Sequence, residues 1–104
     1  MTTLSTHVLD TRLGVPAEGM SVALSRRRED GWEPVFEAVT DSDGRVGDFG
    51  RLDGGVYRLV FETGAYGNDF YPFVAVTFKV ETTRNHLHVP LLLSPYGYTT
   101  YRGS

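Results

Sequence analysis

The sequence predicts an all-β fold, an antiparallel β-sandwich with at most one short helix. Three observations support this prediction. Short stretches alternate apolar and polar residues with a period of two, clusters of turn residues separate them, and no stretch keeps helical spacing beyond a single turn. A chain of 104 residues is long enough for one hydrophobic core and leaves little room for a second. We therefore expect a single domain over residues 1–104.

The alternation gives seven candidate strands, and the two N-terminal ones are described first. Seven stretches have the alternation of a strand, at residues 4–10, 20–25, 32–40, 56–62, 73–80, 86–93 and 98–103. In the first stretch Leu4, Thr6 and Val8 share one face, and His7 lies on the opposite face. Three arginines and two acids follow the second stretch, at residues 26–30. We interpret them as the solvated tip of a hairpin rather than as a basic patch.

A turn is expected after the third stretch, because Asp41 to Gly44 is rich in acids and ends in glycine. The spacing of these acids does not fit a calcium loop, since its first and last positions would fall on Val39 and Gly50. The glycines that follow do not have the spacing of a phosphate-binding loop either. Arg45 stands directly after the turn and by itself is typical of a solvated arginine.

The middle of the chain continues the same alternation. The fourth stretch places Tyr57, Leu59 and Phe61 on one face, which predicts a strand with a buried side. Residues 63–69 are expected to form a loop or one helical turn. The fifth stretch, at 73–80, also alternates and is expected to be half buried.

The C-terminal stretch at 86–93 has the clearest core row of the chain. Its apolar face carries Leu87, Val89, Leu91 and Leu93. Its other face carries His86 and His88 together with Pro90 and Leu92. Two imidazoles on one strand face require water, a ligand, a metal or a partner chain. A turn at 94–97 then leads into a last short strand expected at 98–103.

Composition excludes several classes of protein and of site. The chain has no cysteine, so disulfides and thiolate metal sites are excluded. A formal net charge of −3 indicates no nucleic-acid partner and no attraction to an anionic membrane surface. No apolar run approaches the length of a membrane span. The first ten residues lack the basic and apolar segments of a signal peptide, so we expect a cytoplasmic location.

The three histidines are the candidates for chemistry, because His7 and His88 lie opposite the core rows of their strands. The alternative is three surface or hydrogen-bonded histidines without a catalytic role. If they form a site, a pair of histidines two residues apart plus a third could hold catalytic zinc. The same imidazoles could instead act as general acid and base near neutral pH. The residues alone do not separate these two mechanisms.

Four motifs together resemble the 5-hydroxyisourate hydrolases, enzymes of the urate pathway that are related to transthyretin. They are LSTHVLDT at 4–11, DGR at 43–45, HLHVPLLLSP at 86–95 and YRGS at 101–104. The hormone carrier transthyretin lacks the last motif, and it carries lysine, glutamate and threonine where this chain has His7, Arg45 and His88. The chain departs from the hydrolases at Leu87, where they often have tyrosine, and at Thr99, where they often have serine.

The resemblance implies a transthyretin-like sandwich of two four-stranded sheets. It also implies a homotetramer, a dimer of dimers with a central channel. The implied reaction is hydrolysis of the N1–C6 amide bond of 5-hydroxyisourate, which gives 2-oxo-4-hydroxy-4-carboxy-5-ureidoimidazoline. The family needs no cofactor and no metal for this step. A non-catalytic, transthyretin-like carrier of small aromatic ligands is the alternative function.

The resemblance also implies which residues form the site. The expected catalytic residues are His7, Arg45 and His88, and the same three residues with Tyr101 and Ser104 are expected to bind the substrate. One of the two histidines would take a proton from the attacking water, a role we assign to His88. Arg45 would hold the substrate oxygens and stabilise the oxyanion. The C-terminal segment would close the pocket.

Overall fold

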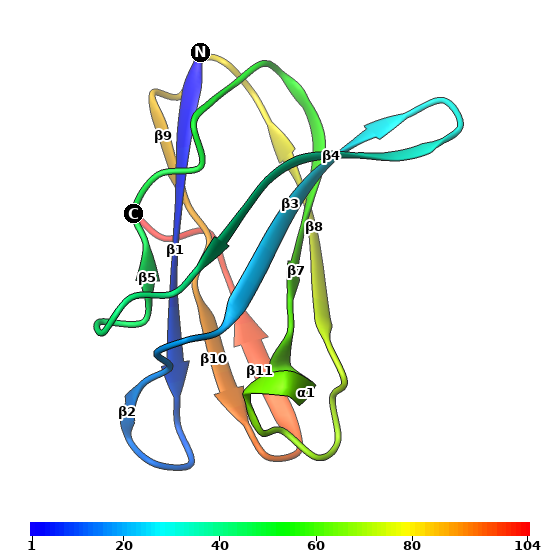
Figure 1. The fold of residues 1–104 in the computed structure, drawn as a ribbon. Coiled ribbons are helices and arrows are strands. Elements are labelled where there is room, and N and C mark those ends of the chain that lie inside the picture. The colour runs from blue at the N-terminus through cyan, green and yellow to red at the C-terminus, as the bar shows by residue number, and fades with distance from the viewer.

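The structure is a computed structural model that describes residues 1–104, and it forms a sandwich of two sheets (Figure 1). The four-stranded sheet has the order β4 (Gly31–Val39), β3 (Ser21–Arg28), β7 (Gly55–Phe61) and β8 (Val74–Val80). The second sheet is built on β1 (Thr2–Asp10), with β2 (Val15–Pro16), β5 (Arg45–Val46), β6 (Arg51–Leu52), β9 (His86–His88), β10 (Leu91–Ser94) and β11 (Gly97–Thr100). The predicted all-β sandwich is confirmed.

Helical structure is confined to one short element. The helix α1 (Thr63–Tyr66) follows β7 directly, within the segment expected to be a loop or one helical turn. It spans four residues, so the chain contains no helix with the length of a membrane span.

The second sheet contains seven segments, where the resemblance implied four strands, because the pairing along both edges of β1 is interrupted. On one edge β6, β5 and β2 pair in turn with successive parts of β1. On the other edge β9 and β10 continue a single register, in which Thr3 lies opposite His86 and Val8 lies opposite Leu91. Pro90 lies between these two segments, and its carbonyl accepts a hydrogen bond from the Thr100 hydroxyl of β11.

The pairing of β1 with β9 and β10 is parallel, which the expectation of a purely antiparallel sandwich did not include. Turn signals in a sequence indicate hairpins, and hairpins join antiparallel neighbours. The first and the penultimate segments of this chain are instead brought together by the fold as a whole. The parallel pair lies in the centre of the second sheet, and it positions two of the three histidines.

One hydrophobic core fills the space between the sheets, and it contains eighteen buried hydrophobic residues in a single cluster. The predicted core row of the C-terminal stretch is confirmed, because Leu87, Val89, Leu91 and Leu93 are all buried. The predicted row of β7 is also buried. In β8 only the two ends are buried, as expected for a half-buried strand. Thr2, Thr6 and Asp10 of β1 are buried beside this core, whereas Thr3, Ser5 and His7 of β1 and the two histidines of β9 lie on the outer face.

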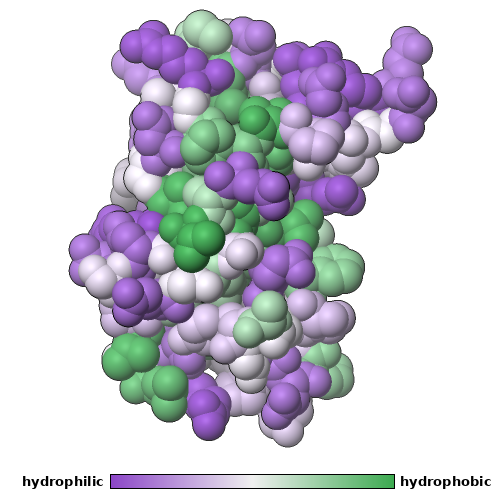
Figure 2. Space-filling model, in the orientation of Figure 1, coloured by the Kyte–Doolittle hydropathy of each residue, from purple (hydrophilic) through white to green (hydrophobic).

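The hairpin predicted at residues 26–30 is present, but the three arginines lie at the end of its first strand rather than in the turn. They continue β3, and the turn lies at residues 29–30. Arg28 pairs with Glu33 at 2.8 Å, and Arg26 donates a hydrogen bond to the carbonyl of Gly54 at 2.7 Å. The β3–β4 hairpin extends beyond the core, so its strands carry polar residues on both faces. Figure 2 shows hydrophilic residues over this projecting hairpin and hydrophobic residues reaching the surface in the middle of the same view.

The last predicted strand also ends earlier than expected. β11 stops at Thr100, and Tyr101 and Arg102 lie outside the ladder. Gly103 returns to the sheet through an isolated antiparallel bridge with His88. The segment after β11, red in Figure 1, therefore brings the C-terminal residues next to β9.

Candidate active site

The turn before β5 places Arg45 opposite His7. One carboxylate oxygen of Asp41 accepts a hydrogen bond from the backbone N–H of Arg45 at 3.0 Å, which closes the turn. Gly44 has a φ of 74°, in the left-handed region that favours glycine. A Cβ atom there would also collide with the carbonyl oxygen of Val8. The tight approach of the turn to β1 then sets the register in which His7 pairs with Arg45.

The opposite edge of β1 brings in His88. The parallel register of β1 and β9 places His88 opposite Ser5. Ser5 and His7 are two residues apart and share the outer face of β1, while Leu87 points into the core. Three neighbouring strands therefore present His7, Arg45 and His88 at one level of the second sheet. The structure thus brings together the three residues expected to be catalytic.

The guanidinium of Arg45 has no carboxylate partner within the chain. The three ion pairs of the chain are Arg26–Asp53, Arg28–Glu33 and Lys79–Glu81. All three lie on other elements, and Arg45 is exposed. Its planar fork of N–H donors is therefore available to a ligand that carries oxygen atoms or negative charge.

The surroundings of His88 favour its neutral form. Burial is the main reason that the pKa of His88 is lowered below the ordinary imidazole value of 6.5. The positive charges of Arg45, His7 and His86 lower this pKa further. A neutral imidazole has a free lone pair, so His88 can accept a proton at physiological pH.

Hydroxyl groups of β1 contact the two histidines of β9. The Ser5 hydroxyl lies 2.8 Å from Nε2 of His86 and 2.8 Å from Nδ1 of His88. The Thr3 hydroxyl lies 2.6 Å from Nδ1 of His86. Both ring nitrogens of His86 are therefore engaged, whereas Nε2 of His88 has no hydrogen-bond partner in the chain.

The segment after β11 packs against His88 through its backbone. The N–H of Gly103 donates a hydrogen bond to the carbonyl of His88 at 2.7 Å. Gly103 also lies so close to the ring of His88 that an added Cβ atom would stand 2.7 Å from Cδ2. Ser104 follows it and is exposed. Tyr101 lies elsewhere within the single chain, in a groove of about 140 Å³ that includes Phe78 and Leu87.

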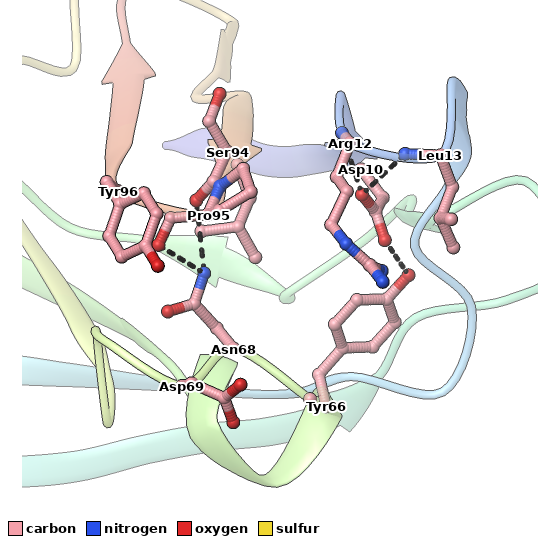
Figure 3. Close-up of a pocket in the computed structure, with 11 residues that line it drawn as sticks. Asp10, Arg12, Leu13, Tyr66, Asn68, Asp69, Ser94, Pro95 and Tyr96 are labelled. Atoms are coloured by element: carbon pink, nitrogen blue, oxygen red, sulfur yellow. Dashed lines mark hydrogen bonds between the residues drawn. The ribbon is translucent and has the colours of Figure 1, made fainter.

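The larger of the two cavities lies away from these residues. It has a volume of about 370 Å³ and is found where the end of β1 approaches α1 and the β10–β11 turn (Figure 3). Tyr66 donates a hydrogen bond to Asp10 at 2.8 Å, and Asn68 donates to the carbonyl of Ser94 at 3.0 Å. These contacts tie α1 to β1 and the residues after α1 to β10. Neither cavity of the chain includes any of the three histidines or Arg45.

The carboxylate of Asp10 in this cavity already has its hydrogen-bond partners. It accepts from Tyr66 and from the backbone N–H groups of Arg12 and Leu13. Burial, with Asp10 as the next cause, raises the pKa of Tyr66 to about 12. The phenol is thus held protonated as a donor, which indicates a structural contact rather than an acid–base pair.

The side chains of the chain that could ligate a metal ion do not form a cluster. No three side chains among histidine, aspartate and glutamate lie close enough together to ligate one. The zinc mechanism therefore lacks a ligand set within one chain.

Ser5 was not among the predicted site residues, and Gly103 was expected there only as part of the segment 101–104. Ser5 does share a face with His7 in the period-two pattern, and this was the available signal. Its contact with both histidines of β9 depends on the parallel register, which the sequence does not reveal. The packing of Gly103 on His88 depends on an isolated bridge rather than on a strand.

Comparison with known proteins relates this chain to a known family. Residues 4–103 match the model of the HIUase/Transthyretin family. A 5-hydroxyisourate hydrolase of Deinococcus radiodurans is 45% identical, over 97% of this chain and 95% of the relative. The structure of Klebsiella pneumoniae 5-hydroxyisourate hydrolase matches with a TM-score of 0.90 and 39% identity, over 100% of both chains. Sea bream transthyretin in complex with thyroxine matches with a TM-score of 0.89 and 32% identity, over 96% and 93%.

Proposed function

This chain belongs to the HIUase/Transthyretin family, and on that premise we propose that it is an enzyme that hydrolyses 5-hydroxyisourate. The product is 2-oxo-4-hydroxy-4-carboxy-5-ureidoimidazoline, and the step belongs to urate degradation. The observation that carries the proposal is the meeting of His7, Arg45 and His88 on one outer sheet face. These are the positions at which the hydrolases differ from transthyretin.

The proposed mechanism uses side chains of this chain and no cofactor or metal. Nε2 of His88 takes a proton from a water molecule whose oxygen forms a bond to C6 of the substrate. The guanidinium of Arg45 stabilises the negative charge that develops on the C6 oxygen. The bond between C6 and N1 then breaks, and His7 delivers a proton to N1. The lowered pKa of His88 supports its role as the base, since the base must be neutral before it acts.

We propose further that the active enzyme is a homotetramer, a dimer of dimers. The support from the structure is that neither cavity of one chain includes the three residues, so a pocket there needs another wall. A second copy placed over this face would supply that wall, and Tyr101 and Ser104 would close the pocket. The proposal includes a single domain over 1–104, a cytoplasmic location, and no nucleic-acid or membrane partner.

A hydrolysis assay separates this enzyme from a carrier of small aromatic ligands. The carrier is the alternative because the fold also matches transthyretin. Purified protein is added to freshly made 5-hydroxyisourate, and the loss of its near-ultraviolet absorbance is followed against the spontaneous rate. We expect rapid loss with catalytic amounts of protein. Loss at the spontaneous rate, with or without ligand binding, would contradict the proposed function.

Removal of metal ions is expected to leave the activity unchanged. The proposed steps use imidazole and guanidinium groups alone, whereas a catalytic zinc would have to be present for turnover. The measurement is the hydrolysis rate after exhaustive chelation, with elemental analysis of the same sample. Stoichiometric zinc whose loss removes the activity would overturn the mechanism.

The pH dependence of the rate follows from the lowered pKa of His88. Protonated His88 cannot accept a proton, so activity should be present at neutral pH and fall as the pH drops through this pKa. The acid limb of kcat/KM is therefore expected below the ordinary imidazole value of 6.5. An acid limb clearly above this value would show that the lowered pKa does not belong to the base.

Deleting residues 101–104 should separate fold from activity. The core rows of β9 and β10 remain, so circular dichroism and sizing chromatography should still show a folded assembly. Turnover should fall by roughly a hundredfold, because even about 1 Å of looseness at a site can cost that much. A folded, tetrameric and fully active truncation would remove the segment from the site.

A single substitution tests the packing of Gly103 against the ring of His88. Gly103→Ala places a methyl group against the ring of His88, so we expect a displaced ring and a lower kcat. The matched control is Gly97→Ala, because Gly97 has open space at its Cβ position and no unusual φ. Equal activity of the two variants would contradict a role of this packing in catalysis.

A further inference from the structure

Four polar side chains form a continuous row across the outer face of β1 and β9. In spatial order they are Thr3, His86, Ser5 and His88, and their contacts are 2.6, 2.8 and 2.8 Å long. Two of them come from each strand, and the parallel register places Thr3 opposite His86 and Ser5 opposite His88. All three distances are those of good hydrogen bonds, so each group in the row has to donate or accept in agreement with its neighbours.

The partners of Thr3 determine which group donates and which group accepts along this row. The Thr3 hydroxyl has two partners, the carbonyl of Asn85 at 3.3 Å, which can only accept, and Nδ1 of His86 at 2.6 Å, which donates or accepts according to its tautomer. We assign the proton of Thr3 to the carbonyl, so that the Thr3 oxygen accepts from His86 and Nδ1 of His86 carries a proton. In a neutral imidazole the other nitrogen is an acceptor. Nε2 of His86 therefore accepts the proton of the Ser5 hydroxyl.

The same argument gives the donor and the acceptor in the contact between Ser5 and His88. The one proton of Ser5 is already donated to His86, so its oxygen can only accept from His88. Nδ1 of His88 must carry a proton, and Nε2 of His88 is left as the lone pair. In this assignment the carbonyl of Asn85 and one serine hydroxyl set the tautomer of an imidazole two residues further along β9.

We propose that Ser5 is a positioning residue that holds His88 in the tautomer protonated on Nδ1, so that Nε2 faces the attacking water as the base. This role rests on the proposed function, since it concerns the step assigned to His88. When Nε2 takes up a proton, Nδ1 keeps its own proton and its bond to Ser5. The ring therefore needs no rotation during the reaction, and Gly103 packs against it.

The same row explains why the two histidines of β9 differ. Both ring nitrogens of His86 are used inside the row, one toward Thr3 and one toward Ser5. His86 has no free lone pair to offer a water molecule. His88 stands at the end of the row and has one, so the row assigns the base to His88.

Nitrogen-15 NMR of histidine-labelled protein tests the proposal directly. At a pH well above the ordinary imidazole pKa, long-range correlations distinguish a protonated from an unprotonated ring nitrogen. We expect His88 in the wild type to show a protonated Nδ1. Ser5→Ala removes the acceptor, so the population protonated on Nε2 should rise, by roughly tenfold relative to the other tautomer for one lost hydrogen bond. Ser5→Thr keeps the hydroxyl and should restore the wild-type spectrum.

Activity gives the second readout. Ser5→Ala should lower kcat by a similar factor with little change in KM, and Ser5→Thr should recover it. The matched control is Ser21→Ala, which removes the same hydroxyl from an exposed position on the other sheet and should leave both readouts unchanged.

The two readouts keep the outcomes distinct. A wild-type His88 protonated on Nε2, or a tautomer ratio that Ser5→Ala does not change, would overturn the role of Ser5. A wild type with the expected tautomer but no hydrolysis would contradict the proposed function instead, because the spectrum of the free protein does not depend on the substrate.

Discussion

His88→Asn should lower the turnover of 5-hydroxyisourate by about 10² to 10⁴-fold, the range typical of a lost general base. Asparagine keeps a polar side chain of similar reach, but its amide does not take up a proton near neutral pH. The backbone bonds of residue 88 to the C-terminal segment do not involve the side chain, so the assembly should stay intact. The measurement is kcat by the absorbance assay, with sizing chromatography on the same sample.

His86→Asn is the matched control for this substitution. It removes an imidazole from the same strand face, but that imidazole has both nitrogens engaged within the chain. Its effect on kcat should therefore be much smaller. A nearly unchanged rate for His88→Asn, or a larger loss for His86→Asn, would move the base away from His88.

Arg45→Glu is expected to abolish hydrolysis more thoroughly than Arg45→Lys. Glutamate places a negative charge where an oxyanion must form, and the loss of one oxyanion donor alone costs about 10² to 10³-fold in other enzymes. Lysine keeps the charge but not the planar fork, so it should retain part of the activity. Both variants should fold, because Arg45 is exposed and its structural bond to Asp41 uses the backbone N–H.

An exposed arginine of the other sheet controls for the change in net charge. Arg27→Glu makes the same change on β3, and its kcat should equal that of the wild type. If Arg45→Glu turned over the substrate as fast as Arg27→Glu, Arg45 would be a solvated turn residue without a role in catalysis.

Much of the fold follows from period-two alternation. The rows of β1, β7 and the C-terminal stretch could be assigned to the core or the outer face before any strand was paired. That alternation also placed His7 and His88 on outer faces. The physical reason is that a buried sheet face tolerates few polar groups, so the pattern carries the orientation of each side chain.

The pairing of distant strands could not be predicted in the same way. No local turn signal connects β1 with β9, and the contact of Ser5 with two histidines exists only in their parallel register. The arginines of β3 were expected in the tip of the hairpin rather than at the end of its first strand for a related reason. A hairpin that extends beyond the core has no apolar row, so composition alone made its strand resemble a turn. The meeting of Arg45 with His7 likewise depends on the close approach of the turn at Gly44.

The central claim is that this protein opens the substrate ring by hydrolysis at C6. Carbon-13 NMR of freshly generated 5-hydroxyisourate labelled at C6 follows that bond itself. With catalytic amounts of the wild-type protein, we predict that the amide signal of C6 is replaced by a carboxylate signal much faster than in buffer. The His88→Asn variant should fall close to the rate in buffer. A C6 amide signal that decays at the buffer rate with the wild type, or a product in which C6 is not a carboxylate, would contradict the account.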